Sequence, residues 1–270
     1  MARSEIDSAW SGWIRTNIER GCSKDDLARI LIREGFDPQA VRRALHLKPH
    51  VERPIVQAHG PASAPTPATM ANVRRFDSSR IELYTANDFL DPEECRSIVS
   101  LTQGRMREST ITSPAEPDRY FRRSLTCDLG LFREEAVQRL ERKLCAALAT
   151  DERYAEPTQA QHYDPGGEFK PHTDYFEEYE ASRYFLPDLG QRSWSFMVYL
   201  NDTLEGGETA FVNVGLVIRP KAGLAVVWNN LLPDGRPNPD TLHHGTPVKR
   251  GHKDIITKWF RVQRRAEKCS

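Results

Sequence analysis

The amino-acid sequence predicts an α+β fold in which helices brace a β-sandwich or jelly roll. Apolar residues recur at helical spacing before about residue 150, and from residue 161 onward short strand-like runs alternate with turn residues. Helices that mostly precede several short strands are typical of a layered domain whose sheet is covered by helices. The expected strands are Ile81–Tyr84, Trp194–Leu200, Thr209–Val212, Leu216–Ile218, Leu224–Trp228 and Asp254–Val262.

Residues 1–48 predict a small module of three helices. Trp10 and Trp13 recur at helical spacing with apolar neighbours, and we expect them to form the core of this module. Ser23 has the position of an N-cap for the second helix, because acidic residues and an apolar face follow it. The pair Asp37-Pro38 is an N-cap followed by a proline at the first helical position, which predicts the start of the third helix.

The remainder of the chain predicts a linker and one larger domain. Residues 49–75 are rich in proline and alanine and contain few residues able to form a core, so we expect a semi-extended linker. Residues 76–266 have the composition of a folded domain. We expect one helix to begin after Asp91 and a longer one between Arg133 and Thr150, where apolar residues again recur at helical spacing.

The charge balance and the cysteines limit the classes of partner and location. The 38 basic residues are matched by 38 acidic ones, so no net field attracts nucleic acid or an anionic membrane. No apolar run approaches the roughly 18 residues of a membrane span, and the N-terminal residues lack the apolar segment of a signal peptide. The five cysteines are odd in number and scattered, which argues against a disulfide framework. We therefore expect a cytoplasmic protein with no nucleic-acid partner and no membrane partner.

Three residues predict a metal site. His172 and Asp174 are two positions apart, so in a strand their side chains would point to the same face. A His-x-Asp pair alone is weak evidence, because many such pairs are structural. A third ligand could come from His243 or the adjacent His244, beyond several predicted strands. Two histidines and one carboxylate that leave neighbouring metal positions open form the facial triad of non-haem Fe(II) oxygenases.

The motifs around these residues resemble the prolyl 4-hydroxylase family of 2-oxoglutarate, Fe(II)-dependent dioxygenases. The resemblance extends from about Ser79 to Val262. It implies a double-stranded β-helix, that is, a jelly-roll barrel whose mouth holds the iron. The segments that carry it are Phe89–Cys95, Arg122–Ser124, Tyr163–Asp174, Tyr199–Asn201, Glu205–Thr209, Trp228–Gly235, Leu242–Val248, Gly251–Lys253 and Thr257–Arg261.

The resemblance also implies ligands and cofactors. The family's histidine-glycine-proline-valine spacing puts His243, and not His244, in register as the third iron ligand, beside His172 and Asp174. Fe(II) is the implied metal, with 2-oxoglutarate and O2 as cosubstrates and ascorbate as a candidate reductant. Lys253 matches the basic residue that pairs with the distal carboxylate of 2-oxoglutarate. The other residues that match the cosubstrate pocket are Tyr163, Tyr199 and Thr209.

On the substrate side the match is partial. Arg192 and Trp259 match positions that shape the substrate pocket in the family, although Trp259 could equally be a core aromatic. Phe169 replaces a common tyrosine, and Arg261 stands where a histidine often follows the Lys-Trp segment. We interpret Trp228 as a core aromatic. The two departures concern the substrate and leave the predicted reaction type unchanged.

The expected function is hydroxylation of a C–H bond, coupled to decarboxylation of 2-oxoglutarate to succinate. A prolyl residue in a peptide or protein is the first expected target, and the N-terminal module could recruit it. A free amino acid or other small metabolite is the alternative substrate. Two other classes are a nucleic-acid demethylase, which the zero net charge disfavours, and a non-catalytic metal-binding adaptor, which the complete ligand set disfavours.

Overall fold

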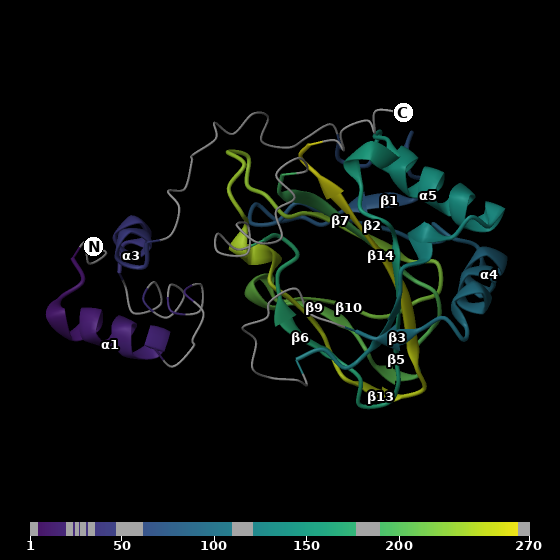
Figure 1. The fold of residues 1–270 in the computed structure, drawn as a ribbon. Coiled ribbons are helices and arrows are strands. Elements are labelled where there is room, and N and C mark those ends of the chain that lie inside the picture. The colour runs from purple at the N-terminus through teal and green to yellow at the C-terminus, as the bar shows by residue number, and fades with distance from the viewer. Residues whose placement is uncertain are drawn as a thin grey trace, which may run out of the picture. The chain divides into compact units, whose positions relative to one another are not determined.

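The computed structural model describes residues 5–19, 24, 27, 31, 36–46, 62–109, 121–176 and 190–263. The chain divides into two compact units, Met1–Val56 and Gln57–Ser270. Figure 1 draws both units. The finer division into a module, a linker and a domain at residues 48 and 75 stays a prediction.

The first unit contains helices α1 (Ser8–Glu19) and α3 (Pro38–Ala44). The Asp37 side chain caps α3 as expected, because its carboxylate accepts a hydrogen bond from the Ala40 amide at 2.9 Å. Most of the second expected helix lies outside the described residues. Trp10 and Trp13 pack against the buried core of this unit, as predicted, and that core consists of Ile14, Leu27, Leu31, Phe36, Val41 and Leu45.

The second unit is built on an eight-stranded antiparallel sheet, counted over the described residues. The strand order is β1-β2-β11-β7-β14-β5-β4-β3, so strands far apart in sequence lie side by side. The strands are β1 (Val73–Arg75), β2 (Leu83–Ala86), β3 (Arg107–Glu108), β4 (Leu125–Cys127), β5 (Gln159–Tyr163), β7 (Arg192–Tyr199), β11 (Ala225–Asn229) and β14 (Lys253–Arg261).

A smaller sheet of order β10-β9-β12-β6 faces the larger one (Figure 1). Apolar side chains from both sheets, including Phe211 of β9 and Val226 of β11, form one buried cluster between them. Two antiparallel layers that enclose a core match the expected jelly roll. The remaining strands are β6 (Phe169–His172), β8 (Glu205–Gly206), β9 (Thr209–Phe211), β10 (Leu216–Ile218), β12 (His243–Gly245) and β13 (Val248–Arg250), of which β8 pairs with β13.

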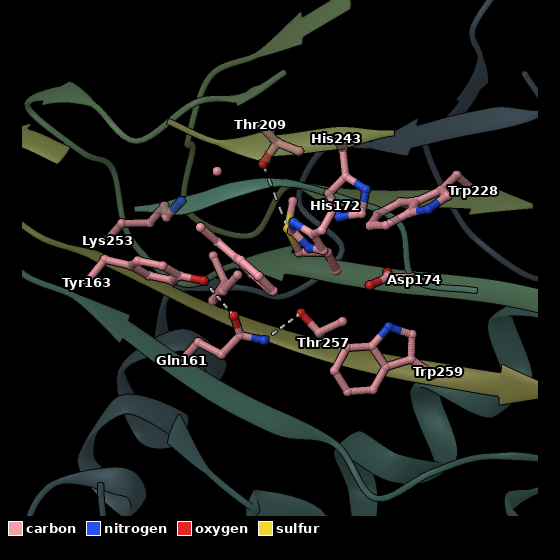
Figure 2. A pocket seen from close by; sticks show the side chains of 14 residues that line it. Gln161, Tyr163, His172, Asp174, Thr209, Trp228, His243, Lys253, Thr257 and Trp259 are labelled. Atoms are coloured by element: carbon pink, nitrogen blue, oxygen red, sulfur yellow. Dashed lines mark hydrogen bonds between the residues drawn. The ribbon is translucent and has the colours of Figure 1, made fainter. Parts of the chain in front are cut away.

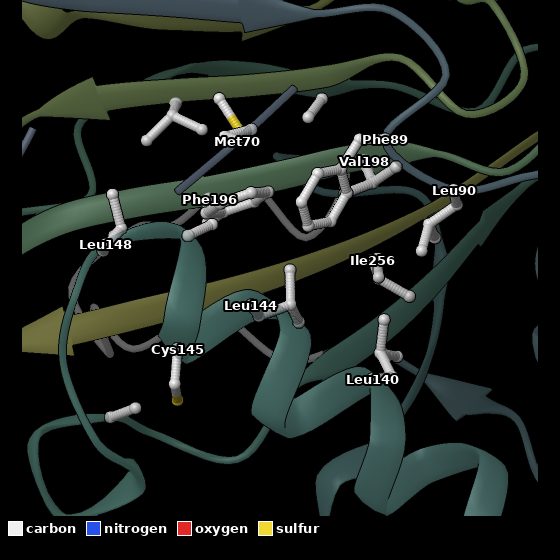
Figure 3. Packing of buried hydrophobic residues seen from close by; sticks show 14 of the residues in the cluster. Met70, Phe89, Leu90, Leu140, Leu144, Cys145, Leu148, Phe196, Val198 and Ile256 are labelled. Carbon is white, nitrogen blue, oxygen red and sulfur yellow. The ribbon is translucent and has the colours of Figure 1, made fainter. Parts of the chain in front are cut away.

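Helices α4 (Pro92–Thr102) and α5 (Glu135–Ala147) cover the outer face of the larger sheet. Asp91 caps α4 in a capping box with Glu94, and Pro92 occupies the first turn. Leu140 and Leu144 of α5 point toward the sheet (Figure 3). Short 3-10 helices lie at Leu129–Leu131, Glu152–Tyr154, Val212–Val214 and Pro239–Thr241.

Strand β7 of the larger sheet contributes side chains to both buried clusters, one on each face of the sheet. Phe196 and Val198 belong to the cluster under the helices, whereas Met197 and Tyr199 belong to the cluster between the sheets. Because successive side chains of a strand point to opposite faces, a segment covered on both sides, such as Phe196–Tyr199, is apolar at every position. That is why a continuous apolar run, and not an alternating one, marks this strand in the sequence.

Several residues assigned to the expected linker are packed on the second unit. Ala62 and Met70 are buried in the cluster under the helices, and β1 pairs with β2. Alanine and methionine are apolar enough to fill gaps in a core even within a proline-rich segment. Helices α4 and α5 and the six expected strands are present, with ends displaced by up to three residues. Within the described part of the chain, no helix is long and apolar enough to cross a membrane.

The packing of α5 predicts a large effect of Leu144→Ala. Leu144 is fully buried, so its truncation should lower the free energy of unfolding by about 2–5 kcal/mol through lost burial and the cavity left behind. Urea denaturation followed by fluorescence measures this change. Leu131→Ala is the matched control, because Leu131 is 67% exposed and should change stability little. Equal effects of the two substitutions would contradict the assigned core.

Candidate metal centre

Three side chains converge where β6 and β12 pair, two from the strands and one from the bend after β6. His172 is the last residue of β6, and His243 is the first residue of β12. The two strands pair with His243 opposite His172, which brings the ring centroids to 4.2 Å. Asp174 lies in the bend after β6, and not in the strand as the spacing suggested. One potential ligand atom from each residue lies within 4.8 Å of the others, and no other such group exists among the described residues.

Backbone carbonyls orient both histidine rings. Nδ1 of His172 lies 2.7 Å from the Lys170 carbonyl oxygen, and Nδ1 of His243 lies 2.9 Å from that of Thr241. A carbonyl only accepts hydrogen bonds, so each Nδ1 carries the proton and each Nε2 keeps its lone pair for a metal. Burial, together with neighbouring His243, holds the pKa of His172 well below its ordinary value. The ring is therefore neutral at pH 7, as metal ligation requires.

The donor set fits a non-haem Fe(II) ion. Asp174 and His243 are buried, and His172 is half-buried, so a carboxylate and two imidazoles face one point. A buried carboxylate is costly without a positive partner, and a divalent cation supplies that charge. His244 points elsewhere, because its Nε2 lies 3.4 Å from a carboxylate oxygen of Glu168. Of the two adjacent histidines, only His243 is placed to join the cluster.

A pocket extends from these three residues to Lys253 at the start of β14 (Figure 2). The Lys253 side chain is 1% exposed, and its Nζ lies 4.3 Å from the ring centroid of Tyr163. Burial lowers the pKa of this lysine from 10.5 to about 8. The residues that line the pocket are Gln161, Tyr163, Phe169, His172, Asp174, Met197, Thr209, Trp228, His243, Gly245, Lys253, Ile255, Thr257 and Trp259.

Lys253 is a buried cation with no counterion among the residues that the structure describes. Within the described residues it forms no ion pair. The charge of Glu208 raises the pKa of Lys253 without forming an ion pair with it. A buried charge without an opposite charge is costly, so an anionic ligand would gain strongly from binding beside it. The pocket thus combines a candidate metal site at one end with a cation at the other.

Of the three other predicted cosubstrate residues, two line the pocket and one lies behind it. Tyr163 and Thr209 line the pocket. The Tyr163 hydroxyl donates to Oε1 of Gln161 at 2.7 Å. Tyr199 does not line the pocket but is fully buried behind it, where its hydroxyl lies 2.6 Å from that of Thr209. Burial raises the pKa of Tyr199 far above its usual value, so the phenol stays protonated and supports Thr209 from behind.

Sequence reasoning missed several residues of the pocket. Ile255 and Thr257 lie two and four positions after Lys253 in β14, so they are on the same face of that strand. Gln161 is likewise on the same face of β5 as Tyr163. The period of two along a strand is the signal that could have found them. Met197 and Gly245 line the pocket as well. Trp228 is 1% exposed, in line with its interpretation as a core aromatic, but it also lines the pocket and contacts His243 edge-on at 5.0 Å.

Two of the predicted substrate residues line the pocket. The Phe169 ring stacks on His172 with 3.4 Å between centroids. Trp259 is 8% exposed and lies on the same face of β14 as Lys253. Both are aromatic surfaces beside the metal ligands, so they are suited to shaping a substrate near that point. Their role in binding substrate stays a prediction.

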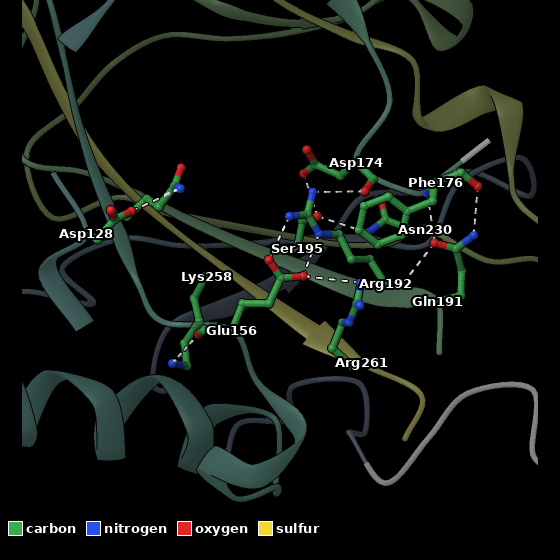
Figure 4. Close-up of polar contacts among 11 residues, drawn as sticks. Asp128, Glu156, Asp174, Phe176, Gln191, Arg192, Ser195, Asn230, Lys258 and Arg261 are labelled. Atoms are coloured by element: carbon green, nitrogen blue, oxygen red, sulfur yellow. Dashed lines mark hydrogen bonds and ion pairs between the residues drawn. The ribbon is translucent and has the colours of Figure 1, made fainter. Parts of the chain in front are cut away.

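The two predicted substrate arginines lie beside the pocket, in an ionic cluster (Figure 4). Arg192 donates to both carboxylate oxygens of Glu156 at 2.7 Å and stacks on Trp259 at 4.1 Å. Arg261 is 2% exposed and lies 3.3 Å from the same carboxylate. Burial alone would raise the pKa of Glu156, but the charges of Arg192 and Arg261 lower it. The residue that replaces the family's histidine is therefore engaged by a carboxylate of the chain itself.

The family model of the 2OG-Fe(II) oxygenase superfamily matches residues 158–261. Among curated proteins, prolyl 4-hydroxylase subunit alpha-1 of Bos taurus is 30% identical over 188 residues, which cover 68% of this chain and 35% of that protein. The probable prolyl 4-hydroxylase 3 of Arabidopsis thaliana is 29% identical over 201 residues, which cover 66% of this chain and 69% of that protein. The chain thus spans about a third of the length of the animal subunit, and over two thirds of the plant protein.

A solved structure supports the same assignment. The viral collagen prolyl hydroxylase of Paramecium Bursaria Chlorella virus-1, in its 2OG complex, is 26% identical, with a TM-score of 0.50. The match covers 66% of this chain and 95% of that one. The fold and the site define a 2OG-Fe(II) oxygenase domain. Over about two thirds of its length, the chain is similar to prolyl 4-hydroxylases.

The geometry predicts different effects for two adjacent histidines. His243→Ala should abolish tight binding of Fe(II), or of Mn(II) as a redox-stable substitute, because it removes one of three ligands. His244→Ala should retain binding within a few-fold, because His244 contacts Glu168 and not the cluster. Anaerobic equilibrium dialysis measures both affinities. Loss of binding in His244→Ala with retention in His243→Ala would reverse the assignment.

Proposed function

We propose that this chain is an Fe(II)- and 2-oxoglutarate-dependent dioxygenase that hydroxylates a prolyl residue of a peptide or protein. One observation carries the proposal. A cluster of two histidines and a carboxylate shares a pocket with a buried lysine that has no counterion among the described residues. A divalent metal and a dicarboxylate would satisfy both ends of the pocket at once.

The residues of the chain have separate tasks in this reaction. His172, Asp174 and His243 would hold Fe(II), and Lys253 would pair with the distal carboxylate of 2-oxoglutarate, which Tyr163 and Thr209 flank. When bound, the metal and cosubstrates supply the oxidising chemistry, in which 2-oxoglutarate becomes succinate and CO2 and the substrate gains one oxygen atom. The apolar walls of the pocket exclude water from the reacting centre.

The substrate class rests on the relatives and on the aromatic surfaces near the metal ligands. The proteins that this chain resembles are named as prolyl hydroxylases. Trp259 lies beside the metal ligands, and Arg192 stacks on its ring and holds it in place. A proline ring packs well on such a flat apolar surface. The N-terminal unit, in which Trp10 and Trp13 pack against the core, would recruit the protein substrate.

Substrate-stimulated succinate formation tests the proposal. The full chain is loaded with Fe(II) and supplied with 2-oxoglutarate, O2 and ascorbate, together with a panel of proline-containing peptides. Peptide-dependent succinate and one added oxygen atom on a proline, located by mass spectrometry, are expected, and Asp174→Ala should give neither. No stimulation by any peptide would contradict the prolyl assignment. Turnover of free amino acids alone would establish the metabolite alternative.

The lowered pKa of Lys253 predicts a pH-dependent affinity for 2-oxoglutarate. The lysine is charged below pH about 8 and neutral above it. The apparent Kd should therefore rise as pH increases beyond that value, by up to about tenfold per pH unit. Titration calorimetry of the Mn(II)-loaded protein between pH 7 and 9.5 measures this change.

Lys253→Ala is the matched variant for this titration. It should weaken 2-oxoglutarate binding by about 10- to 100-fold at pH 7, because one charge-assisted hydrogen-bonding partner is lost. It should also remove the pH dependence while Mn(II) binding persists. A Kd that is constant with pH in the unmodified chain would show that Lys253 does not pair with the ligand.

A further inference from the structure

Asp174 is tied to the two sheet strands beneath it by a relay of two buried polar residues. We infer that Ser195 and Asn230 are positioning residues that hold the Asp174 carboxylate so that only one of its oxygens faces the metal. The inference rests on the proposed function, because it concerns how this chain would present its ligand to Fe(II).

The relay is short and closed to solvent (Figure 4). The Ser195 hydroxyl donates to Oδ2 of Asp174 at 2.6 Å, and Nδ2 of Asn230 donates to the Ser195 oxygen at 2.9 Å. Ser195 and Asn230 are fully buried, and Asp174 is 6% exposed. Water therefore does not compete for these hydrogen bonds, which makes them stronger and more directional than bonds at the surface.

The direction of each hydrogen bond follows from what the groups can do. A metal-ligating carboxylate only accepts, so Ser195 must donate its single proton to Asp174. The serine oxygen is then left as an acceptor, which requires the NH2 group of Asn230 to point toward it. The amide therefore has one orientation, and it fixes the hydroxyl rotor of Ser195 in turn.

The backbone holds the relay in place. Ser195 lies on β7 opposite Trp228 of β11, and Asn230 follows directly after β11. The backbone N–H of Asn230 donates to the backbone carbonyl of Ser193 at 2.7 Å. The backbone carbonyl of Asn230 accepts from the backbone N–H of Asn238 at 2.9 Å. Both side chains of the relay are thus carried by a rigid part of the larger sheet, whereas Asp174 itself lies in a bend outside any strand.

The consequence concerns the number of open metal positions. One oxygen of Asp174 is occupied by Ser195, and the other forms no hydrogen bond within the residues that the structure describes. The carboxylate would therefore ligate through a single oxygen. A carboxylate free to rotate can ligate through both oxygens, which would fill a position that a chelating cosubstrate or O2 needs. The relay would thus leave those metal positions open.

Cobalt binding tests this inference independently of turnover. Co(II) replaces Fe(II), stays reduced in air, and has a visible spectrum that depends on coordination number. Ser195→Ala should bind Co(II) about tenfold more weakly, as is typical when a partner of a metal ligand is lost. It should also change the Co(II) spectrum and weaken 2-oxoglutarate binding to the Co(II)-loaded protein. Ser195→Thr retains the hydroxyl and should restore the spectrum of the unmodified chain.

Ser193→Ala is the matched control on the same strand. Ser193 is fully buried, as Ser195 is, but its hydroxyl donates to the Phe260 carbonyl and not to Asp174. Its truncation should leave the Co(II) affinity and spectrum unchanged. Asn230→Leu removes the donor without altering Ser195, and it should shift the spectrum in the same direction as Ser195→Ala. It provides a second test if Ser195→Ala does not fold.

Two outcomes separate the inference from the proposed function. If the unmodified chain binds Co(II) and 2-oxoglutarate, and both Ser195→Ala and Asn230→Leu keep its affinity and spectrum, the positioning role is wrong and the proposed function stands. If the unmodified chain binds no Co(II), the proposed function itself is wrong. Equal spectral changes in Ser193→Ala and Ser195→Ala would indicate a general packing defect and would also overturn the inference.

Discussion

The pairing of β12 with β6 places His243 opposite His172, and the rest of the site is arranged around that pair. The register matters because side chains alternate between the two faces of a strand, so a slip of one residue would present His244 in place of His243. The same strand pairs on its other side with β9, where Gly245 lies opposite Thr209. Two ladders of backbone hydrogen bonds therefore fix a ligand and a pocket residue together.

The larger sheet supplies rigidity because both of its faces are buried. Along β14, Ile255 and Thr257 face the pocket, whereas Ile256 and Phe260 face the helices. Any displacement of a pocket residue would also disturb the packing of its neighbours under α4 and α5, since protein interiors are close-packed. The helices thus contribute to the geometry of a site that they do not touch.

The sequence was most informative where chemistry restricts the residue type. The meeting of His172, Asp174, His243 and Lys253 in one pocket was predictable, because few other residue types could bind a metal or pair with a carboxylate. The position of Tyr199 behind Thr209 was not predictable. The local sequence pattern is the same for a tyrosine that lines the pocket and for one that is buried behind it. The pairing of Arg261 with Glu156 depends on contacts between distant segments, which spacing in one chain does not encode. Met70 shows the same limit for the fold, since an isolated apolar residue in a proline-rich stretch carries no periodic signal.

Strand β14 carries two buried lysines with opposite surroundings. Lys258 faces α5, where the carboxylate of Glu141 is its permanent partner. Lys253 faces the pocket, and the described residues offer it no such partner. The folded chain thus bears the cost of one desolvated charge until a ligand neutralises it. Occupancy of the pocket and the stability of the jelly roll would thereby be linked, because a dicarboxylate that binds only the folded chain would favour that state over the unfolded one.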